Sequence, residues 1–443
     1  MLLPPAGVIP LNILLEVSGS PATDPTFLYV SIRDALDRQI RPTLRSGASV
    51  AYGPIVPWPL FPLATGGGAT VNVTVSISSG DTSVPVTAVT TVTVYSVAIP
   101  PLAPCVLFLS DDPEYLQSDG LVFRGDATRD RPARLYYYHS DIGAPRDVDV
   151  ILTVTAPARV QIISSEAGPD LDVMSVGHTV SRDLLRYVEN NEGTVVDIVP
   201  GKPFIVRHAL ILQGEVIAGA IDVNVVSGQA VALSVVVAPA GSSPSLYLAG
   251  PRVAYDGHGR HGMFDLAGYG NIAASYTVGG PSIALQYGGR EPTPHNLVTS
   301  DDGHDYGDYG VTRRITFTLV NPTDTPQLVY LYEKPLGGAT RSSFLVDGQP
   351  KELDCVRVPQ PYTLSTYQLL PHSTGISTML TMTDGGSFYP VEVGATNLQP
   401  IPNAPSVGTP DGCSPKEPTF PDQSGASGES ADFHRDGTRQ SQR

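Results

Sequence analysis

Runs of alternating apolar and polar residues dominate this chain, and Gly, Pro, Ser or Asp bound them. In the clearest run, VNVTVSIS at 71–78, the valines and the isoleucine fall on one face and the polar residues on the other. A period of two predicts strands with one buried face, as in antiparallel sandwiches. The run at 84–97 repeats the pattern after the turn SSGDTS, which predicts a hairpin.

The strand-like runs form three units. The first covers residues 1–100, and the Pro-rich segment IPPLAP separates it from a second unit at 101–241 with eight expected strands. A third unit covers 242–400. We therefore predict an all-β fold of tandem antiparallel β-sandwiches, Ig-like or jelly-roll-like in type. Residues 401–443 have almost no aliphatic side chains and are expected to form a disordered tail.

One stretch departs from the strand pattern. Between residues 172 and 189, Val176, Val180, Leu184 and Tyr187 follow one another at spacings of three and four, with charged residues between them. This period predicts one short amphipathic helix. We expect it to lie across an end of the second sandwich.

Composition narrows the class of protein. Gly numbers 44 and Pro 42, above average usage of about 7% and 5%, and only 16% of residues are charged. A coiled coil, a long helical bundle and a wholly disordered chain are excluded. The net charge of −16 argues against a nucleic-acid partner, which requires a basic surface. No apolar run reaches the ~18 residues of a transmembrane segment.

Three cysteines, Cys105, Cys355 and Cys413, allow at most one disulfide. A Cys355–Cys413 bridge that pins the C-terminal segment is the pairing we favour. The chain has no basic residue before Arg33 and so lacks the positive start of a signal peptide. Either the protein is cytosolic or its export signal is absent from this chain. Because low charge and serial β-units are typical of exported envelope proteins, we favour an extracellular or cell-surface location.

A Gly-rich acidic segment, HNLVTSDDGHDYGDYGV, begins at His295 and offers the densest group of carboxylates. Ca²⁺ prefers several carboxylate and carbonyl oxygens around one loop. The spacing does not fit an EF-hand. The simpler alternative is a loop whose aspartates only cap turns. No other cofactor is expected, and the candidate metal ligands are Asp301, Asp302, Asp305 and Asp308.

A second candidate is the segment AYDGHGRHGMFD, which contains Asp256, His258 and His261. Two imidazoles and a carboxylate are ligands that suit a transition metal. The glycines argue against the helix that a zincin motif needs, so a Gly-rich turn with solvated histidines is the alternative. If this loop meets the acidic loop in the fold, the two could form one joint site.

Tyrosines are candidates for a glycan platform, because aromatic faces pack on sugar rings. In the strand containing Tyr136, Tyr137 and Tyr138, the first and third side chains share one face and the second lies on the other. Cross-strand packing is the alternative role. The candidate ligand-binding residues are Tyr136, Tyr138, Tyr306 and Tyr309, with Trp58 as a further ring. No catalytic residue is assigned, since the chain contains no nucleophile elbow, Walker A or dinucleotide motif.

Residues from about 105 to 400 resemble a group of uncharacterised exported bacterial β-sandwich proteins. In that group a DSPE-like turn, a gLYYYH strand and a VGk helix recur. Here the matching segments are DDPE at 111–114, RLYYYHS at 134–140 and VGH at 176–178. The resemblance implies an exported β-protein with no assigned activity, and it transfers no functional residue.

Three functions fit these observations. The first is a non-enzymatic structural or adhesive protein of the bacterial cell envelope or extracellular space, with cell-surface polysaccharide or other envelope proteins as partners. The second is a glycan-binding module that uses Tyr faces and a possible Ca²⁺ loop. The third is a polysaccharide-acting hydrolase whose carboxylates converge only in the fold.

Overall fold

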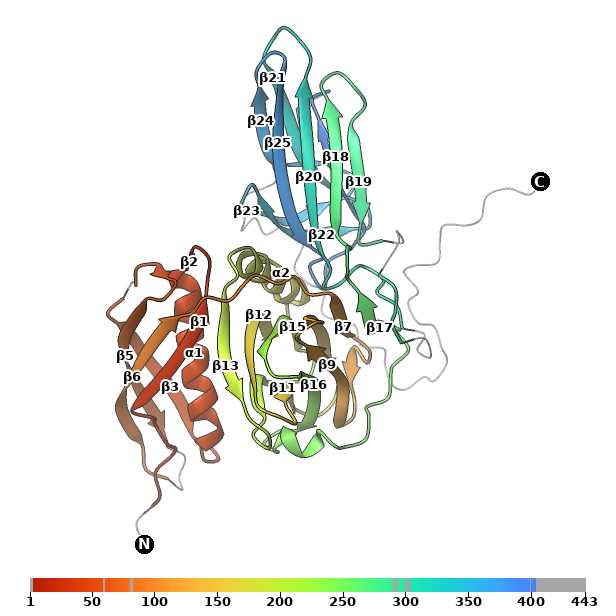
Figure 1. Cartoon of the computed structure of the whole chain (residues 1–443). Coiled ribbons are helices and arrows are strands. Elements are labelled where there is room, and N and C mark those ends of the chain that lie inside the picture. Colours follow the sequence, from red (N-terminus) through yellow and green to blue (C-terminus); the bar gives the residue numbers. More distant parts are fainter. Residues whose placement is uncertain are drawn as a thin grey trace, which may run out of the picture.

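A computed structural model describes residues 3–58, 60–79, 83–289, 294–298, 303–398 and 400–403. Most of these residues lie in strands, which confirms the predicted all-β, multi-sandwich fold (Figure 1). The predicted tail lies outside the described residues, apart from its first three positions. None of the helices in the described part of the chain is long and apolar enough to cross a membrane.

The first sheet runs through the N-terminal unit and the middle unit without a break. Its strand order is β17-β7-β10-β15-β12-β13-β1-β6-β5-β3, and β8 pairs with β10. Parallel pairing of β1 with β6 and antiparallel pairing of β1 with β13 connect the two units. The strands are β1 Asn12–Ser18, β3 Ser49–Val56, β5 Gly68–Ser78, β6 Val86–Ser96, β7 Val106–Ser110, β8 Tyr115–Leu116, β10 Ala133–Asp141, β12 Ala158–Asp170, β13 Gly193–Ile198, β15 Val216–Ser227 and β17 His261–Asp265.

A second sheet, of order β14-β11-β16-β9, packs on the middle part of the first sheet. Its strands are β9 Gly120–Thr128, β11 Arg146–Thr153, β14 Phe204–Ile211 and β16 Ala230–Pro239. Phe108, Leu135, Val150 and Val235 meet between the two layers and are buried. Burial of each such side chain contributes about 2 kcal/mol. All eight runs expected in this unit form strands. The structure adds two strands, β8 and β9, that the pattern did not predict.

The C-terminal unit is a separate sandwich whose sheets have the orders β18-β20-β25-β22-β23 and β19-β26-β21-β24. Phe317, Leu331 and Val393 lie in its core. Because β17 pairs with β7 of the first sheet, this sandwich begins at Asn271, later than the boundary expected at residue 242. Its strands are β18 Asn271–Thr277, β19 Ile283–Tyr287, β20 Thr312–Asn321, β21 Gln327–Pro335, β22 Ala339–Val346, β23 Gln349–Arg357, β24 Tyr362–Leu369, β25 Ser373–Met382 and β26 Val391–Thr396.

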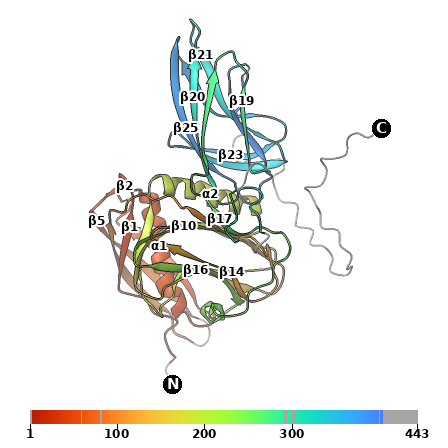
Figure 2. The ribbon, with the colours of Figure 1, turned by 45° about the vertical axis from the view of Figure 1, so that its right-hand side comes forward.

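The predicted amphipathic helix is confirmed as α2 Val173–Glu189. Asp172 begins it, since its carboxylate accepts a hydrogen bond from Ser175 N at 3.1 Å. The expected position across an end of the sandwich is wrong. The helix lies against β12 and β15 on the face opposite the second sheet, and the C-terminal unit packs on its other side (Figure 2).

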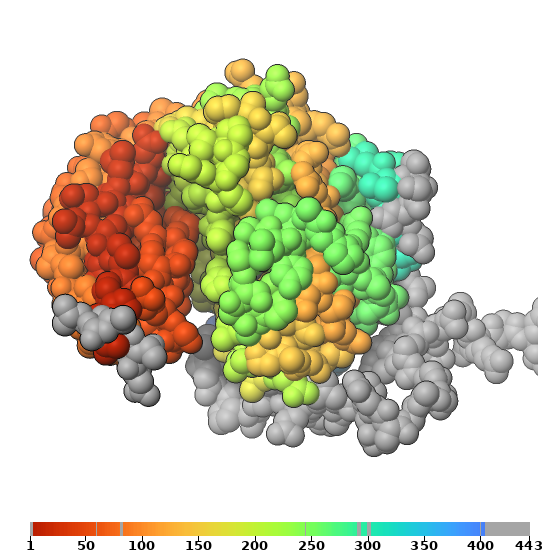
Figure 3. All heavy atoms as spheres, turned by 90° about the horizontal axis from the view of Figure 1, so that it is seen from below, coloured from red at the N-terminus to blue at the C-terminus, as the bar shows by residue number. Residues whose placement is uncertain are grey.

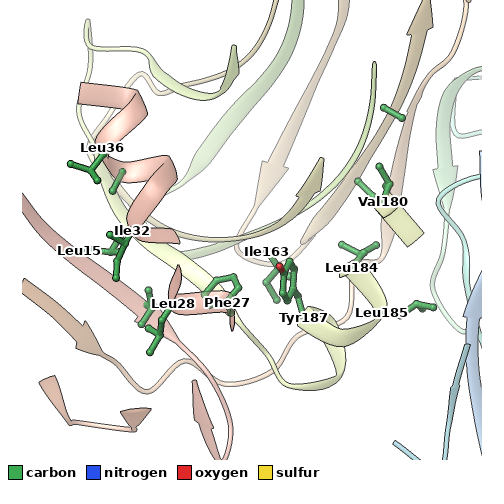
Figure 4. Close-up of a cluster of buried hydrophobic side chains, with 14 of the residues drawn as sticks. Leu15, Phe27, Leu28, Ile32, Leu36, Ile163, Val180, Leu184, Leu185 and Tyr187 are labelled. Carbon is green, nitrogen blue, oxygen red and sulfur yellow. The ribbon is translucent and has the colours of Figure 1, made fainter. Parts of the chain in front are cut away.

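A helix that the strand pattern did not predict, α1 Pro25–Ile40, covers the strands of the N-terminal unit. Asp24 accepts a hydrogen bond from Thr26 N at 2.7 Å, and Pro25 occupies the first helical position. Phe27 at its start meets Tyr187 of α2, with ring centroids 5.0 Å apart. Figure 4 shows these two rings between Leu28 of α1 and Leu184 of α2. The helix thereby joins the N-terminal unit to the middle unit, which lie side by side in Figure 3.

Shorter elements complete the described chain: β2 Ala22–Thr23 pairs with β4 Leu63–Ala64, and the 3₁₀ turns are η1 Arg41–Thr43 and η2 Pro244–Tyr247. Cys105 has a free thiol. Cys355 is disulfide-bonded, and its predicted partner Cys413 lies outside the described residues.

Candidate functional site

Three loops meet beyond the end of β7: residues 111–115, 255–261 and 303–309. The backbone N–H of His304 donates to the carbonyl oxygen of Gly259 at 2.7 Å. The two Gly-rich loops proposed as a joint site are therefore neighbours. A bare Cβ at Gly303 would fall 1.9 Å from the carbonyl oxygen of His261, so only glycine fits where they touch.

The carboxylate of Asp112 holds the 255–261 loop in place through three contacts. It accepts hydrogen bonds from the backbone N–H groups of Asp256, at 2.7 Å, and Gly259, at 2.8 Å. The same carboxylate lies 3.2 Å from Nδ1 of His261. Because Asp112 is buried, these contacts replace the water that its charge would otherwise require. Asp112 thus fixes the loop that contains the predicted ligands.

Asp256 and His258 form a pair at the surface. The Asp256 carboxylate lies 2.6 Å from Nδ1 of His258 and accepts a hydrogen bond from Tyr115 N at 3.0 Å. Burial opposes ionisation of Asp256, but its hydrogen bonds with His258, Tyr115 N and Asp112 together outweigh burial and lower the pKa of the carboxyl. The same hydrogen bond raises the pKa of His258, whose Nε2 also lies 3.8 Å from Glu114. The raised pKa favours the charged form of this partially exposed imidazole.

Arg260 links the loops to the buried interior. Its guanidinium donates to Asp111 and to Glu114, and it lies over the ring of Tyr309 at 5.9 Å. Burial raises the pKa of Asp111 to about 8, against the opposing effect of Arg260. The hydrogen bonds of Arg260 to Asp111 and Glu114 stabilise the floor of the site and leave His258 at its surface.

The two described candidate carboxylates of the acidic loop, Asp305 and Asp308, contact other groups of the protein. Asp305 is buried and accepts a hydrogen bond from Tyr309 N at 2.9 Å, and burial raises its pKa well above the usual range. Asp308 forms an ion pair with Arg313. Asp301 and Asp302 lie outside the described residues, so a Ca²⁺ site here stays a prediction. Among the residues that the structure describes, no three His, Cys, Asp or Glu side chains are arranged to hold a metal ion.

Two of the four candidate ligand-binding tyrosines, Tyr136 and Tyr138, are buried, which corrects the prediction. Tyr136 and Tyr138 share one face of β10 and Tyr137 lies on the other, as predicted, but both faces of this strand are buried. Tyr136 is 1% exposed and Tyr138 8%, so neither ring can stack on a ligand. The covering layer on their face includes α2 and Tyr309, whose ring stacks on Tyr136 at 5.8 Å. The strand pattern could not reveal this second layer.

Other rings lie around the joined loops; Tyr115 is half-buried and the others are exposed. Tyr306 is 52% exposed and packs on His304, with centroids 4.7 Å apart. Tyr255 is 40% exposed and stacks on the buried His261 at 3.8 Å, and Tyr115 meets His258 at 5.6 Å. We call this group the ring surface; its members are Tyr115, Tyr255, His258, His304 and Tyr306. The sequence analysis did not predict a role for Tyr115 or Tyr255. Tyr115 directly follows the segment DDPE, and Tyr255 lies within the segment AYDGHGRHGMFD.

A serine–histidine–aspartate group lies elsewhere, between α2 and the C-terminal unit. Nδ1 of His178 lies 2.7 Å from Asp384 and 3.2 Å from Oγ of Ser343, and Nε2 faces Glu352 at 2.9 Å. In a catalytic triad the carboxylate and the nucleophile contact different nitrogens. Here they share one nitrogen, so the group is arranged as a structural clamp.

A cavity of about 450 Å³ opens where the linker at 101–105 passes between the units. Its wall includes the free thiol of Cys105 and the buried Arg134. Arg134 makes two hydrogen bonds to Asp222, at 2.5 and 2.8 Å, and one to the carbonyl oxygen of Gly310 at 2.9 Å. The charge of Arg134 is thus paired within the protein, and its contact with Gly310 stabilises the junction of the units.

No family model and no curated protein matches this chain. Among solved structures, Lac15 from a marine microbial metagenome is similar over 74% of this chain and 72% of its own, at 8% identity and a TM-score of 0.14. The CBM22-1–CBM22-2 tandem domain of Xyn10C from Paenibacillus barcinonensis is similar over 83% of this chain and 87% of its own, at 8% identity and a TM-score of 0.12. Scores this low carry no functional argument.

Proposed function

We propose that this chain is a non-enzymatic, adhesive protein of the bacterial cell envelope or extracellular space, and that its ring surface binds cell-surface polysaccharide. The observation that carries the proposal is the group of exposed rings on loops that Asp112 and Arg260 hold in place. Tyr and His side chains combine an apolar face with a polar tip, which suits the alternating CH and OH groups of a sugar. A rigid platform also loses little entropy on binding.

Two further features support this role. The carboxylates and arginines around the rings are engaged in contacts that fix the loops, which favours binding over proton transfer. The shared first sheet and the contacts of α2 join the three units, so force on one unit is transmitted to the others. The resemblance to exported bacterial proteins agrees with an extracellular location. Calcium binding by Asp301, Asp302, Asp305 and Asp308 is part of the proposal, and it would require Asp305 and Asp308 to exchange their present contacts with Tyr309 N and Arg313 for the ion.

A glycan array tests the proposal when it is probed with the intact chain, once with Ca²⁺ and once with chelator. We expect binding to at least one class of bacterial polysaccharide, and weaker binding with chelator if calcium orders the acidic loop. Release of reducing sugar from a bound polysaccharide would replace the adhesive role with the hydrolase hypothesis. Binding to none of the glycans would refute the proposal.

A further inference from the structure

The cavity beside the linker has the size and the position of a small-molecule site. Its volume of about 450 Å³ lies within the roughly 300–1,000 Å³ of ligand pockets, which often form where units of a chain meet. The linker, the end of α2, the loop after β17 and strands β10, β12, β15, β20 and β25 all contribute to its wall. We call it the junction cavity; among the described residues, none of those that line it belongs to the ring surface.

Apolar side chains from several elements form one part of the wall. Ile163 of β12 and Leu380 of β25 are buried, as are Leu266 and Val311. On the linker side Leu102 is half exposed. Water against such side chains has few hydrogen-bond partners, so its displacement by an apolar group is favourable. This part of the wall therefore favours the apolar body of an organic ligand.

The linker forms a fixed side of the cavity. Nδ2 of Asn191 donates to the carbonyl oxygen of Ile99 at 2.7 Å, and Leu266 N donates to the carbonyl oxygen of Cys105 at 2.9 Å. Between these two contacts three prolines restrict the backbone. The cavity is therefore pre-formed, and a ligand does not need to order the chain as it binds.

The charged groups of the wall are neutralised by partners. Arg134 forms two hydrogen bonds with Asp222, and Arg314 forms an ion pair with Glu189 at 2.5 Å. An anionic ligand would compete with Asp222 for Arg134, and a cationic ligand would face both guanidinium groups. A neutral ligand avoids both costs, because a buried charge without a partner is unfavourable.

Arg134 has hydrogen-bonding capacity left for a ligand. A guanidinium group has five N–H donors, and three of those on Arg134 meet Asp222 and Gly310. Among the described residues, the other donors of Arg134 have no acceptor. Because Arg134 lines the cavity, a carbonyl oxygen of a ligand can accept a hydrogen bond there.

The free thiol of Cys105 belongs to the same wall. It is half-buried and lies 3.6 Å from the carbonyl oxygen of Pro132, and burial raises its pKa. A protonated thiol behaves as a small apolar group and not as a nucleophile. Cys105 therefore adds to the apolar part of the wall, and its accessibility reports whether the cavity is occupied.

We propose that the junction cavity binds a small, neutral organic molecule, with an aromatic or branched apolar body and a carbonyl oxygen that accepts a hydrogen bond from Arg134. The volume is too small for a protein domain. A sugar would leave hydroxyl groups unpaired against Ile163, Leu266 and Leu380. This site is independent of the proposed adhesive role.

Prodan, a neutral naphthalene ketone whose fluorescence emission shifts to the blue in apolar surroundings, is the probe that tests this inference. We expect the intact chain to bind Prodan saturably, with blue-shifted emission. Anilinonaphthalene sulfonate has a similar ring system with a negative charge, and we expect it to bind at least about tenfold more weakly. No saturable binding of Prodan, or tighter binding of the sulfonate, would overturn the inference.

Ala267→Trp places a large side chain in the cavity from the exposed loop after β17. We expect this variant to bind Prodan about tenfold more weakly or less. Ala240→Trp adds the same side chain at an exposed turn outside the cavity and should bind like the wild type. Circular dichroism should report a folded chain for both variants. Unchanged Prodan binding by a folded Ala267→Trp variant would overturn the inference.

Alkylation of Cys105 by N-ethylmaleimide gives a second measurement that needs no variant. With Prodan at about ten times its Kd, alkylation should slow about tenfold, because only the unoccupied fraction reacts. Peptide mapping assigns the rate to Cys105. An unchanged rate with Prodan bound would place the probe elsewhere and overturn the inference.

Tyr255→Ala separates this site from the ring surface, because Tyr255 does not line the cavity. We expect the variant to bind Prodan like the wild type, whatever its affinity for glycans. Loss of Prodan binding in Tyr255→Ala would place the probe on the ring surface, which would overturn the present inference and leave the proposed function standing.

Discussion

His178 lies 2.7 Å from the buried carboxylate of Asp384, and this contact fastens helix α2 to the C-terminal sandwich. Glu352 faces the other nitrogen of the imidazole at 2.9 Å. Burial alone would lower the pKa of His178, but its hydrogen bonds to the two carboxylates raise it to about 9. The ring is therefore cationic at neutral pH and holds two units together.

We expect His178→Gln to lower the free energy of unfolding by ~3 kcal/mol at pH 6, because Asp384 then remains buried without a cation. The folded pKa lies above the unfolded value of ~6.5. The stabilisation is therefore complete below about pH 6.5 and is lost as the pH rises through about 9. Urea unfolding at pH 6 and pH 10 measures this, and the variant should differ less from wild type at pH 10. His372→Gln, in an exposed pair with Asp324, is the control and should change little. An equal loss at both pH values would contradict this role.

Gly177 provides a second test of the same interface. A helical Gly→Ala change on an exposed surface usually stabilises by about 1 kcal/mol. Here the added Cβ would fall 1.9 Å from the carbonyl oxygen of Gly385. We expect Gly177→Ala to destabilise the chain by about 2 kcal/mol instead. Thermal unfolding measures the sign, with Thr179→Ala in the same helix as control. A raised melting temperature in Gly177→Ala would show that the units do not pack this closely.

Asp112→Ala should loosen the ring surface. It removes the acceptor for Asp256 N and Gly259 N, and each lost hydrogen bond costs about 1 kcal/mol. We expect faster hydrogen exchange at the amides of Asp256 and Gly259, and weaker glycan binding because the loop that positions Tyr255 and His258 is loosened. Asp130→Ala removes an exposed carboxylate from a turn and should change neither. Unchanged exchange at both amides would mean that Asp112 does not hold the loop.

The strand pattern predicted most of the fold because one buried face leaves a period of two in the sequence. The apolar residues at 71–78 are buried as expected, and the spacing of Val176, Val180 and Leu184 predicted α2. Helix α1 had a comparable signal in Asp24, Pro25 and the spacing of Leu28, Ile32 and Leu36, but the strand pattern that dominates the unit left it unpredicted. Local signals of this kind can be read from sequence.

Contacts between distant segments could not be read in the same way. The pairing of Glu16 with Val195 joins two units, and only the three-dimensional fold reveals it. For the same reason Tyr136 and Tyr138 lie on the predicted face but under a second layer. The meeting of His304 with Gly259 was conceivable from sequence, yet its position depended on how β17 pairs. The grouping of the exposed rings into one surface is therefore visible only in the three-dimensional structure.

The most direct test of the adhesive role is the affinity of the double variant Tyr255→Ala/Tyr306→Ala for the polysaccharide that the wild type binds best on the array. Tyr29→Ala removes a ring of similar exposure, 38%, from α1 and is the control. We expect the double variant to stay folded and to bind at least about tenfold more weakly, while Tyr29→Ala binds normally. Undiminished affinity in the folded double variant would show that the ring surface does not bind the polysaccharide.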